Sequence, residues 1–199
     1  LLARVYLFYT GYYGKTELGD ITKSYVLEGL EDVISNSGHD ILSNFASLWP
    51  VASSYQKTVD GTTEYAGKGN NETVFAIKYN YTSNYDGNTD GNHWLVMMGL
   101  RGVMHYPYSQ GWGACTVSED LWKAYSPNDT RRKASIIDVE GESVEQDITD
   151  QREYTGYSNK KYAPRAIYNS DGKLVDEAEN LGAVNFMIGQ FQDYVSIRF

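Results

Sequence analysis

Hydrophobic positions recur at helical spacing over the first part of the chain. The clearest helix is predicted over residues 22–37, where apolar side chains return every three or four positions. Asp20 or Thr22 offers an N-cap for this helix, and Gly38 suits a left-handed exit from it. Residues 1–14 carry a second helical stripe. The sequence therefore predicts a helical beginning.

The later elements are shorter and more irregular. Residues 41–49 indicate a looser helix that Pro50 ends, because proline disfavours a helical residue before it. Residues 73–79 alternate as a strand does, and Thr116 with Glu119 forms a capping box ahead of a short amphipathic helix. Further strands or single turns are expected at residues 136–139, 183–188 and 191–199. The predicted fold class is α+β, mainly irregular and α-helical.

Neither end of the sequence has the signals of a natural terminus. No N-cap residue precedes the first helical stripe, and no turn signal follows the final strand at residues 191–199. No basic segment followed by a small-residue cleavage site marks a signal peptide. We therefore expect an internal fragment of a longer protein.

Charge and composition exclude several classes of partner. The 199 residues carry a formal net charge of −9 and contain no block of Lys or Arg. Nucleic acid is therefore not an expected partner, because its binding gains affinity from basic side chains that release counterions from the phosphates. No apolar run approaches the ~18 residues of a membrane span. Cys115 is the only cysteine, so neither an intrachain disulfide nor a zinc-ligand spacing is available. We expect it to be a small, partly buried thiol.

One polar loop has the spacing of half a calcium site. Asp86, Asn88 and Asp90 stand at the first, third and fifth positions of a calcium loop, with a glycine at the sixth. Position twelve should be a bidentate Glu but is Met97. A polar loop using Asp and Asn for turns is the alternative interpretation. The sequence predicts no cofactor and at most weak calcium binding.

The segment 92–113 concentrates aromatic rings and planar polar groups. Such a mixture suits sugar, because a pyranose lays its C–H face on a flat ring while amide and guanidinium groups meet its hydroxyls. The apolar stretch 94–100 is also compatible with a core position for Trp94. Burying three ring faces against a sugar would supply about 6 kcal/mol of binding free energy before the cost of association. The dissociation constant is then limited to tens of micromolar or weaker. The candidate ligand-binding residues are Asn92, Trp94, Arg101, Tyr106, Tyr108, Gln110 and Trp112.

Catalysis is not predicted. A glycosidase needs two carboxylates facing across a cleft, whereas the acidic run of this chain alternates with polar residues like a solvated face. No hydrolase, phosphate-binding or metalloprotease motif is present. The acidic run consists of Asp138, Glu140, Glu142, Glu145, Asp147 and Asp150.

Several segments resemble a known family. They are LLARVYLFYTGYYGK at the start, LWKAYSPNDTRR at 121–132, YSNKKY at 157–162 and DYVSIRF at the end, the most specific parts being Asp129-x-Arg131 and Ile197-Arg198. Together they resemble the SusD/RagB family of Bacteroidetes outer-membrane nutrient-binding lipoproteins. From the residues alone, Asp129 and Arg131 are interpreted as a structural pair that ties a turn.

The resemblance implies an organisation and a location. Tetratricopeptide-like helices at 1–40 would frame a variable ligand-binding lobe at 41–190, and the strand at 191–199 would lead into a missing C-terminal helix. Family members sit on the outer membrane at the cell surface through a lipid anchor, which here would lie outside the segment. They deliver oligosaccharides to a SusC-like TonB-dependent transporter.

The leading hypothesis is therefore binding of an oligosaccharide or starch-like glycan at the cell surface, with delivery to such a transporter. One alternative is a protein-interaction module of the outer-membrane complex that binds no sugar itself. A second is a glycoside hydrolase.

Overall fold

The computed structural model describes residues 1–79, 92–102, 104–145, 149, 151, 153–181 and 194–199. The chain divides into two compact units. Unit 1 comprises Leu1–Ile41, Gly69–Ala76 and Val195–Phe199, and unit 2 comprises Leu42–Lys68 and Ile77–Tyr194. None of the helices in these described residues combines the length and hydropathy that crossing a membrane requires.

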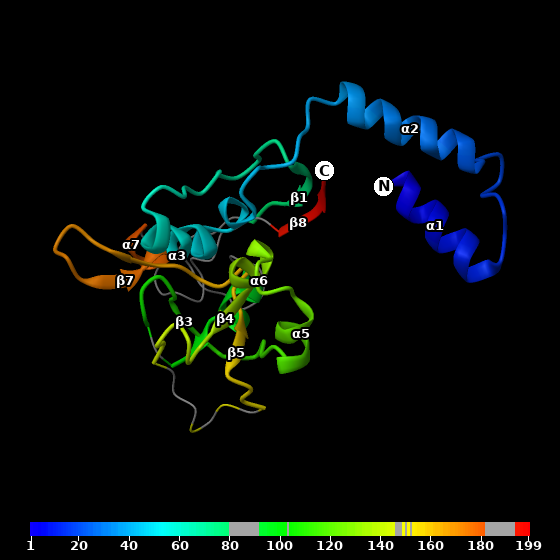
Figure 1. The fold of residues 1–199 in the computed structure, drawn as a ribbon. Helices are drawn as coiled ribbons and strands as arrows, with labels where there is room; N and C mark the ends of the chain where they lie inside the picture. Colours follow the sequence, from blue (N-terminus) through cyan, green and yellow to red (C-terminus); the bar gives the residue numbers. More distant parts are fainter. Residues whose placement is uncertain (80–91, 103, 146–148, 150, 152, 182–193) are drawn as a thin grey trace. The chain divides into compact units, whose positions relative to one another are not determined.

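Unit 1 is built from two helices and most of a strand pair (Figure 1). Helix α1 (Leu2–Tyr13) ends at Gly14 in the left-handed conformation, and α2 (Lys23–Asn36) begins at Thr22, whose hydroxyl accepts a hydrogen bond from Tyr25 N. Strand β1 (Thr73–Ile77) pairs with β8 (Tyr194–Arg198). The helices and the final strand expected from the sequence are confirmed.

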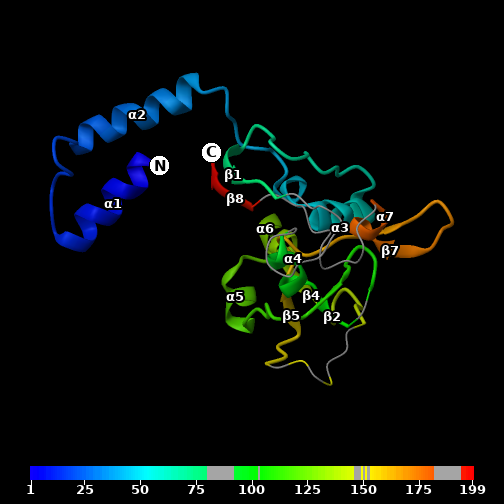
Figure 2. The same ribbon diagram turned by 180° about the vertical axis from the view of Figure 1, so that it is seen from behind.

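Unit 2 holds the remaining elements, which are short helices and two-residue or three-residue strands (Figures 1 and 2). The helices are η1 (Phe45–Leu48), α3 (Pro50–Asp60), α4 (His93–Met98), α5 (Glu119–Ala124), α6 (Thr130–Ser135) and α7 (Glu177–Asn180). The strands are β2 (Leu100–Arg101), β3 (Gln110–Gly111), β4 (Ile136–Asp138), β5 (Tyr157–Asn159), β6 (Ala166–Tyr168) and β7 (Leu174–Asp176). Strands β2 and β3 are parallel, whereas β4–β5 and β6–β7 are antiparallel. The architecture is mixed α+β with short strand pairs.

Two local expectations need correction, and a third is not tested. Pro50 does not simply end a helix: Trp49 before it is extended, and Pro50 is the first residue of α3, where its missing N–H costs nothing. Helix α5 is capped by the Ser118 hydroxyl, which accepts from Leu121 N, rather than by Thr116. The predicted element at 183–188 lies outside the described residues.

The turn before α6 agrees with the sequence. The Asp129 carboxylate accepts from the backbone N–H of Arg131 at 2.9 Å and also pairs with the Arg131 guanidinium. It therefore acts as an N-cap and as an ion-pair partner at once. The structural interpretation of this pair is confirmed, as is the partly buried state of Cys115.

A charged pair lies in the interior of unit 2. The Lys160 ammonium donates to Glu142 Oε1 at 2.7 Å and lies 3.7 Å from the centre of the Tyr55 ring. The Tyr108 hydroxyl donates to the other Glu142 oxygen. Lys160 is fully buried, and only 6% of the Glu142 side chain is exposed. The expectation that Glu142 belongs to a solvated face is wrong, because this carboxylate neutralises a buried lysine.

The pKa of Lys160 makes stability depend on pH. Burial lowers this pKa from 10.5 to about 8, although Glu142 acts in the opposite direction. Above about pH 8 the folded chain thus releases a proton that the unfolded chain still holds. Raising the pH from about 8 to about 10 should therefore increase the stability of the wild type over a Lys160→Met variant, on the order of 2 kcal/mol. Urea unfolding of both proteins measures this, and a constant or shrinking difference would contradict it.

Candidate functional site

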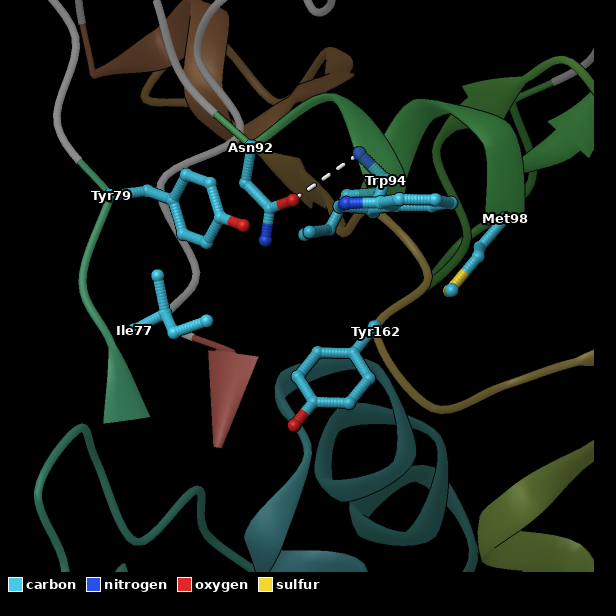
Figure 3. A pocket seen from close by; sticks show the side chains of 7 residues that line it. Ile77, Tyr79, Asn92, Trp94, Met98 and Tyr162 are labelled. Carbon is cyan, nitrogen blue, oxygen red and sulfur yellow. Dashed lines mark hydrogen bonds between the residues drawn. The ribbon is translucent and has the colours of Figure 1, made fainter. Parts of the chain in front are cut away.

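Unit 2 contains a pocket walled by aromatic rings, which we call the Trp94 pocket (Figure 3). Its volume of about 420 Å³ lies within the roughly 300–1,000 Å³ of small-molecule sites. The rings come from three segments: the stretch just after β1, helix α4 and the loop after β5. The lining residues are Ile77, Tyr79, Asn92, Trp94, Leu95, Met98 and Tyr162.

Helix α4 presents Trp94 to the pocket. The helix begins where the Asn92 side-chain oxygen accepts from Trp94 N at 3.2 Å. Leu95 and Val96 are buried beneath it, while Trp94 keeps 58% of its surface exposed. In Figure 3 the indole is seen edge-on, with one flat face turned toward Tyr162 across the pocket. A ring displayed in this way is available for stacking.

Tyr162 is fixed on the opposite side of the pocket. Its backbone has a φ of 58°, in the left-handed region that a non-glycine residue rarely adopts. Its ring meets Trp49 edge-on, with 4.9 Å between the ring centres. Trp49 is itself buried, so the position of Tyr162 is set by the core of unit 2. Rare backbone conformations of this kind gather at ligand sites.

The lining of the Trp94 pocket selects for a neutral ligand. None of the lining residues, all of them in the described part of the chain, carries a formal charge. Tyr79 and Tyr162 add phenol hydroxyls to ring faces, and Asn92 adds an amide that is partly used as the cap of α4. Flat rings with a few polar groups match the C–H faces and hydroxyls of a pyranose.

A second concavity, the Trp112 groove, has a different lining. Its volume is about 510 Å³. Trp112 is 44% exposed, and its carbonyl oxygen accepts from Arg101 Nη1 at 3.1 Å. Gln151 Nε2 donates to the carbonyl oxygen of Gly113 at 2.7 Å. The lining residues are Arg101, Trp112, Gly113, Ala114, Thr116, Gln151 and Glu153.

Both tryptophans are anchored to the same short helix. The backbone N–H groups of Trp112 and Ala114 donate to the carbonyl oxygens of Val96 and Met97, at 2.8 and 2.9 Å. Gly113 N donates to the carbonyl oxygen of Gly99, the residue after α4, at 2.9 Å. The last turn of α4 is thus closed by the segment that carries Trp112. A change in this packing would move both rings.

The structure divides the predicted ligand-binding residues into three groups. Asn92 and Trp94 line the Trp94 pocket, and Arg101 and Trp112 line the Trp112 groove. Tyr106, Tyr108 and Gln110 line neither concavity in the described part of the chain.

Two of these positions have a clear structural role instead. Tyr108 is 1% exposed in the core, so the expectation that its ring is displayed to a ligand is wrong. Its ring is covered by core residues and its hydroxyl is used by Glu142. The Tyr106 ring stacks on Tyr168, with 5.3 Å between the ring centres.

Sequence reasoning missed two of the three rings of the Trp94 pocket. Tyr79 ended a predicted strand, and Tyr162 belonged to a segment used only for family resemblance. Both residues are far from Trp94 in sequence, and only folding brings them to it. Gln151 and Glu153 carried no local signal either.

No metal centre is found among the described residues, where no group of three or more His, Cys, Asp or Glu side chains is arranged to hold an ion. The expected calcium ligands Asp86, Asn88 and Asp90 lie outside the described residues.

The fold of this chain is similar to that of several solved structures. Surface glycan-binding protein A from Bacteroides thetaiotaomicron, in complex with laminarihexaose, matches 88% of this chain with a TM-score of 0.63 and 18% identity. The Bacteroides fluxus protein matches 85% of the chain (TM-score 0.58, 18% identity), and the Bacteroides uniformis protein matches 88% (TM-score 0.56, 17% identity). The fold is shared with part of surface glycan-binding protein A. This chain spans 36%, 31% and 30% of those three proteins, respectively.

These matches correct the family resemblance. The chain is similar in structure to surface glycan-binding protein A, and this finding replaces the SusD/RagB assignment made from the sequence. No family model and no curated protein matches the chain.

Proposed function

We propose that this chain binds a neutral oligosaccharide at the cell surface, with a sugar ring held in the Trp94 pocket. The observation that carries the proposal is the set of three aromatic rings, from three segments of unit 2, around a pocket whose lining residues in the described part of the chain carry no charge. The solved complex of a similar fold with laminarihexaose supports the choice of a glucan oligosaccharide as ligand. The name of that protein, a surface glycan-binding protein, supports the location.

The expected affinity is modest. Each ring face that stacks on a sugar covers about 80 Å², which supplies roughly 2 kcal/mol before the cost of association. A pocket with two or three such faces binds in the range of tens of micromolar or weaker. Such affinity suits capture followed by release. Delivery to a TonB-dependent transporter stays a prediction.

Trp94→Ala should weaken binding of laminarihexaose about 30-fold, because it removes a ring face whose stacking on the sugar supplies roughly 2 kcal/mol of binding free energy. Isothermal titration calorimetry of wild type and variant measures the change. Trp94 is largely exposed, so the thermal midpoint should shift little.

Tyr25→Ala is the matched control for this experiment. Tyr25 is an aromatic residue in α2 with 60% of its surface exposed, and it lines neither of the two concavities. The control should titrate like the wild type. Equal affinity of Trp94→Ala and wild type would remove the basis of the proposal.

Protein interaction without direct sugar binding is the second candidate, and one observation favours it. Helices α1 and α2 leave large apolar side chains exposed, among them Leu7 and Phe8 at 69% and 70% and Ile34 at 67%. Exposed apolar patches mark interaction surfaces. Under this alternative no oligosaccharide in a glycan panel would bind the wild-type chain, whereas Phe8→Ala would weaken capture of the partner.

We propose binding without hydrolysis of the glycan. Among the residues that the structure describes, none of those lining the Trp94 pocket is a carboxylate, and a separate hollow in unit 2 contains Glu119, Asp138 and Glu140. Glu119 pairs there with Lys123 at 2.9 Å, and Asp138 Oδ1 accepts from Gly141 N at 3.0 Å. Because these groups are used in local structure, a reducing-end assay with laminarihexaose should stay silent.

A further inference from the structure

We propose that the Trp112 groove is a second carbohydrate-binding surface of unit 2, distinct from the Trp94 pocket and specific for a neutral, hydroxyl-rich ligand. This inference rests on the proposed function, because it assigns a second contact for the same class of ligand. It is carried by a different set of residues, which share no member with the Trp94 pocket.

The groove combines an exposed ring with hydrogen-bonding groups of both kinds. Trp112 offers a partly exposed indole, and Arg101, Gln151, Glu153 and Thr116 surround it. A guanidinium only donates, a carboxylate only accepts, and amide and hydroxyl groups do both. Adjacent sugar hydroxyls need donors and acceptors side by side, whereas an apolar ligand would leave these groups unpaired.

Arg101 retains the capacity to meet a ligand. Its guanidinium has five N–H donors, and Nη1 donates to the carbonyl oxygen of Trp112 at 3.1 Å. In the described part of the chain no carboxylate lies within ion-pair distance of it. The bond to the backbone of Trp112 ties the guanidinium to the segment that carries the indole. With Glu153 also lining the groove, the formal charges of its described lining residues cancel, which favours a neutral ligand over an anionic one.

Backbone forms part of the wall of the groove. Gly113 has a φ of +63°, and a Cβ atom placed on it would lie 3.0 Å from the Cβ of Arg101 and would meet Oε1 of Gln151. A side chain at this position would therefore collide with Gln151 and crowd Arg101. Glycine lets the backbone pass close to both of these polar side chains and keeps them in their places along the groove.

The two surfaces are held in a constant relation by α4. Trp112 N bonds to the carbonyl oxygen of Val96, which lies in the same helix as Trp94. An oligosaccharide that binds one surface raises the local concentration of sugar at the other. Two weak contacts can therefore retain a long glycan better than either contact alone.

Calorimetric titration of laminarihexaose into wild type, Trp94→Ala, Trp112→Ala and the double variant tests the inference. We expect Trp112→Ala to weaken binding about 3-fold to 10-fold, and Trp94→Ala to retain weak binding that the double variant loses. Arg101→Met, which keeps the aliphatic stem, should also weaken binding in the Trp94→Ala background. Circular dichroism confirms that each variant is folded.

The outcomes separate this inference from the proposed function. If Trp94→Ala weakens binding while Trp112→Ala binds like the wild type, and the double variant binds like Trp94→Ala, the second surface does not exist but the first one does. If Trp112→Ala alone abolishes binding, the groove is the main site and the Trp94 assignment fails. If the wild type binds no laminarihexaose, both assignments are overturned for this ligand.

Discussion

Glu142→Gln should lower the free energy of unfolding by about 3–5 kcal/mol at neutral pH, because it leaves the buried Lys160 ammonium without its counter-ion. Lys160 is fully buried, and its ammonium donates to Glu142 at 2.7 Å. Tyr108 donates to the same carboxylate but brings no charge. Glutamine fills a similar volume, so the loss reports the charge rather than a cavity. Urea denaturation measures it.

Two further variants make this prediction specific. Adding Lys160→Met to Glu142→Gln removes the orphaned charge and should recover part of the lost stability. Lys123→Met breaks an ion pair with Glu119 of similar length, 2.9 Å, whose side chains are 63% and 58% exposed. This variant should leave the urea midpoint nearly unchanged, because water screens an exposed ion pair. Equal losses for Lys123→Met and Glu142→Gln would show that burial of the Lys160–Glu142 pair carries no energetic weight.

Gly111→Ala should destabilise unit 2 by about 1–3 kcal/mol and weaken binding of sugar together. A Cβ atom on Gly111 would meet the carbonyl oxygen of Val96 and lie 2.5 Å from the Cα of Gly99. Both obstacles are backbone, so no side chain can rotate away to relieve the clash. The variant must push β3 away from α4, which displaces the two segments that carry Trp94 and Trp112. Denaturation and titration with laminarihexaose measure the two effects.

Gly29→Ala is the matched control for Gly111→Ala. Gly29 lies inside α2, with no atom within 4 Å of the Cβ that alanine would add. Alanine is the better helix former by about 1 kcal/mol, so this change should be neutral or stabilising. A Gly111→Ala variant as stable as the wild type, with unchanged affinity, would contradict the coupling of β3 to α4.

Local signals in the sequence predict local structure well. Thr22 and Gly38 bound α2 because a hydroxyl that accepts an amide proton and a residue that tolerates positive φ act within a few positions. The same holds for Asp129 and Arg131 at the start of α6. Pro50 shows the limit of such rules, since a residue that stops one helix also suits the first position of the next.

Burial was harder to predict than secondary structure. Tyr108 lies among Gly, Pro and Ser residues, a context typical of a surface loop, yet it is a core residue. Glu142 belongs to an acidic run, yet its partner Lys160 is 18 positions away. In both cases the deciding contact is distant in sequence, so no local pattern carries it.

The candidate site was predicted in part for the same reason. Trp94 and Trp112 were recognisable as flat rings beside amide and guanidinium groups. Tyr79 and Tyr162 complete the Trp94 pocket from other segments, and no spacing in the sequence relates them to α4. The type of ligand could thus be inferred from residue types, whereas the shape of the pocket required the fold.

The central claim is that Trp94 stacks on a sugar ring, and the four tryptophan indole N–H signals in a nitrogen-15 NMR spectrum test it most directly. Trp122 stacks on Tyr157 with the Arg132 guanidinium 4.4 Å from its ring centre and lines neither the Trp94 pocket nor the Trp112 groove, so it serves as the internal reference. On titration with laminarihexaose we expect a large shift of the Trp94 signal and a small shift of the Trp122 signal. Binding of the oligosaccharide with an unmoved Trp94 signal would contradict it.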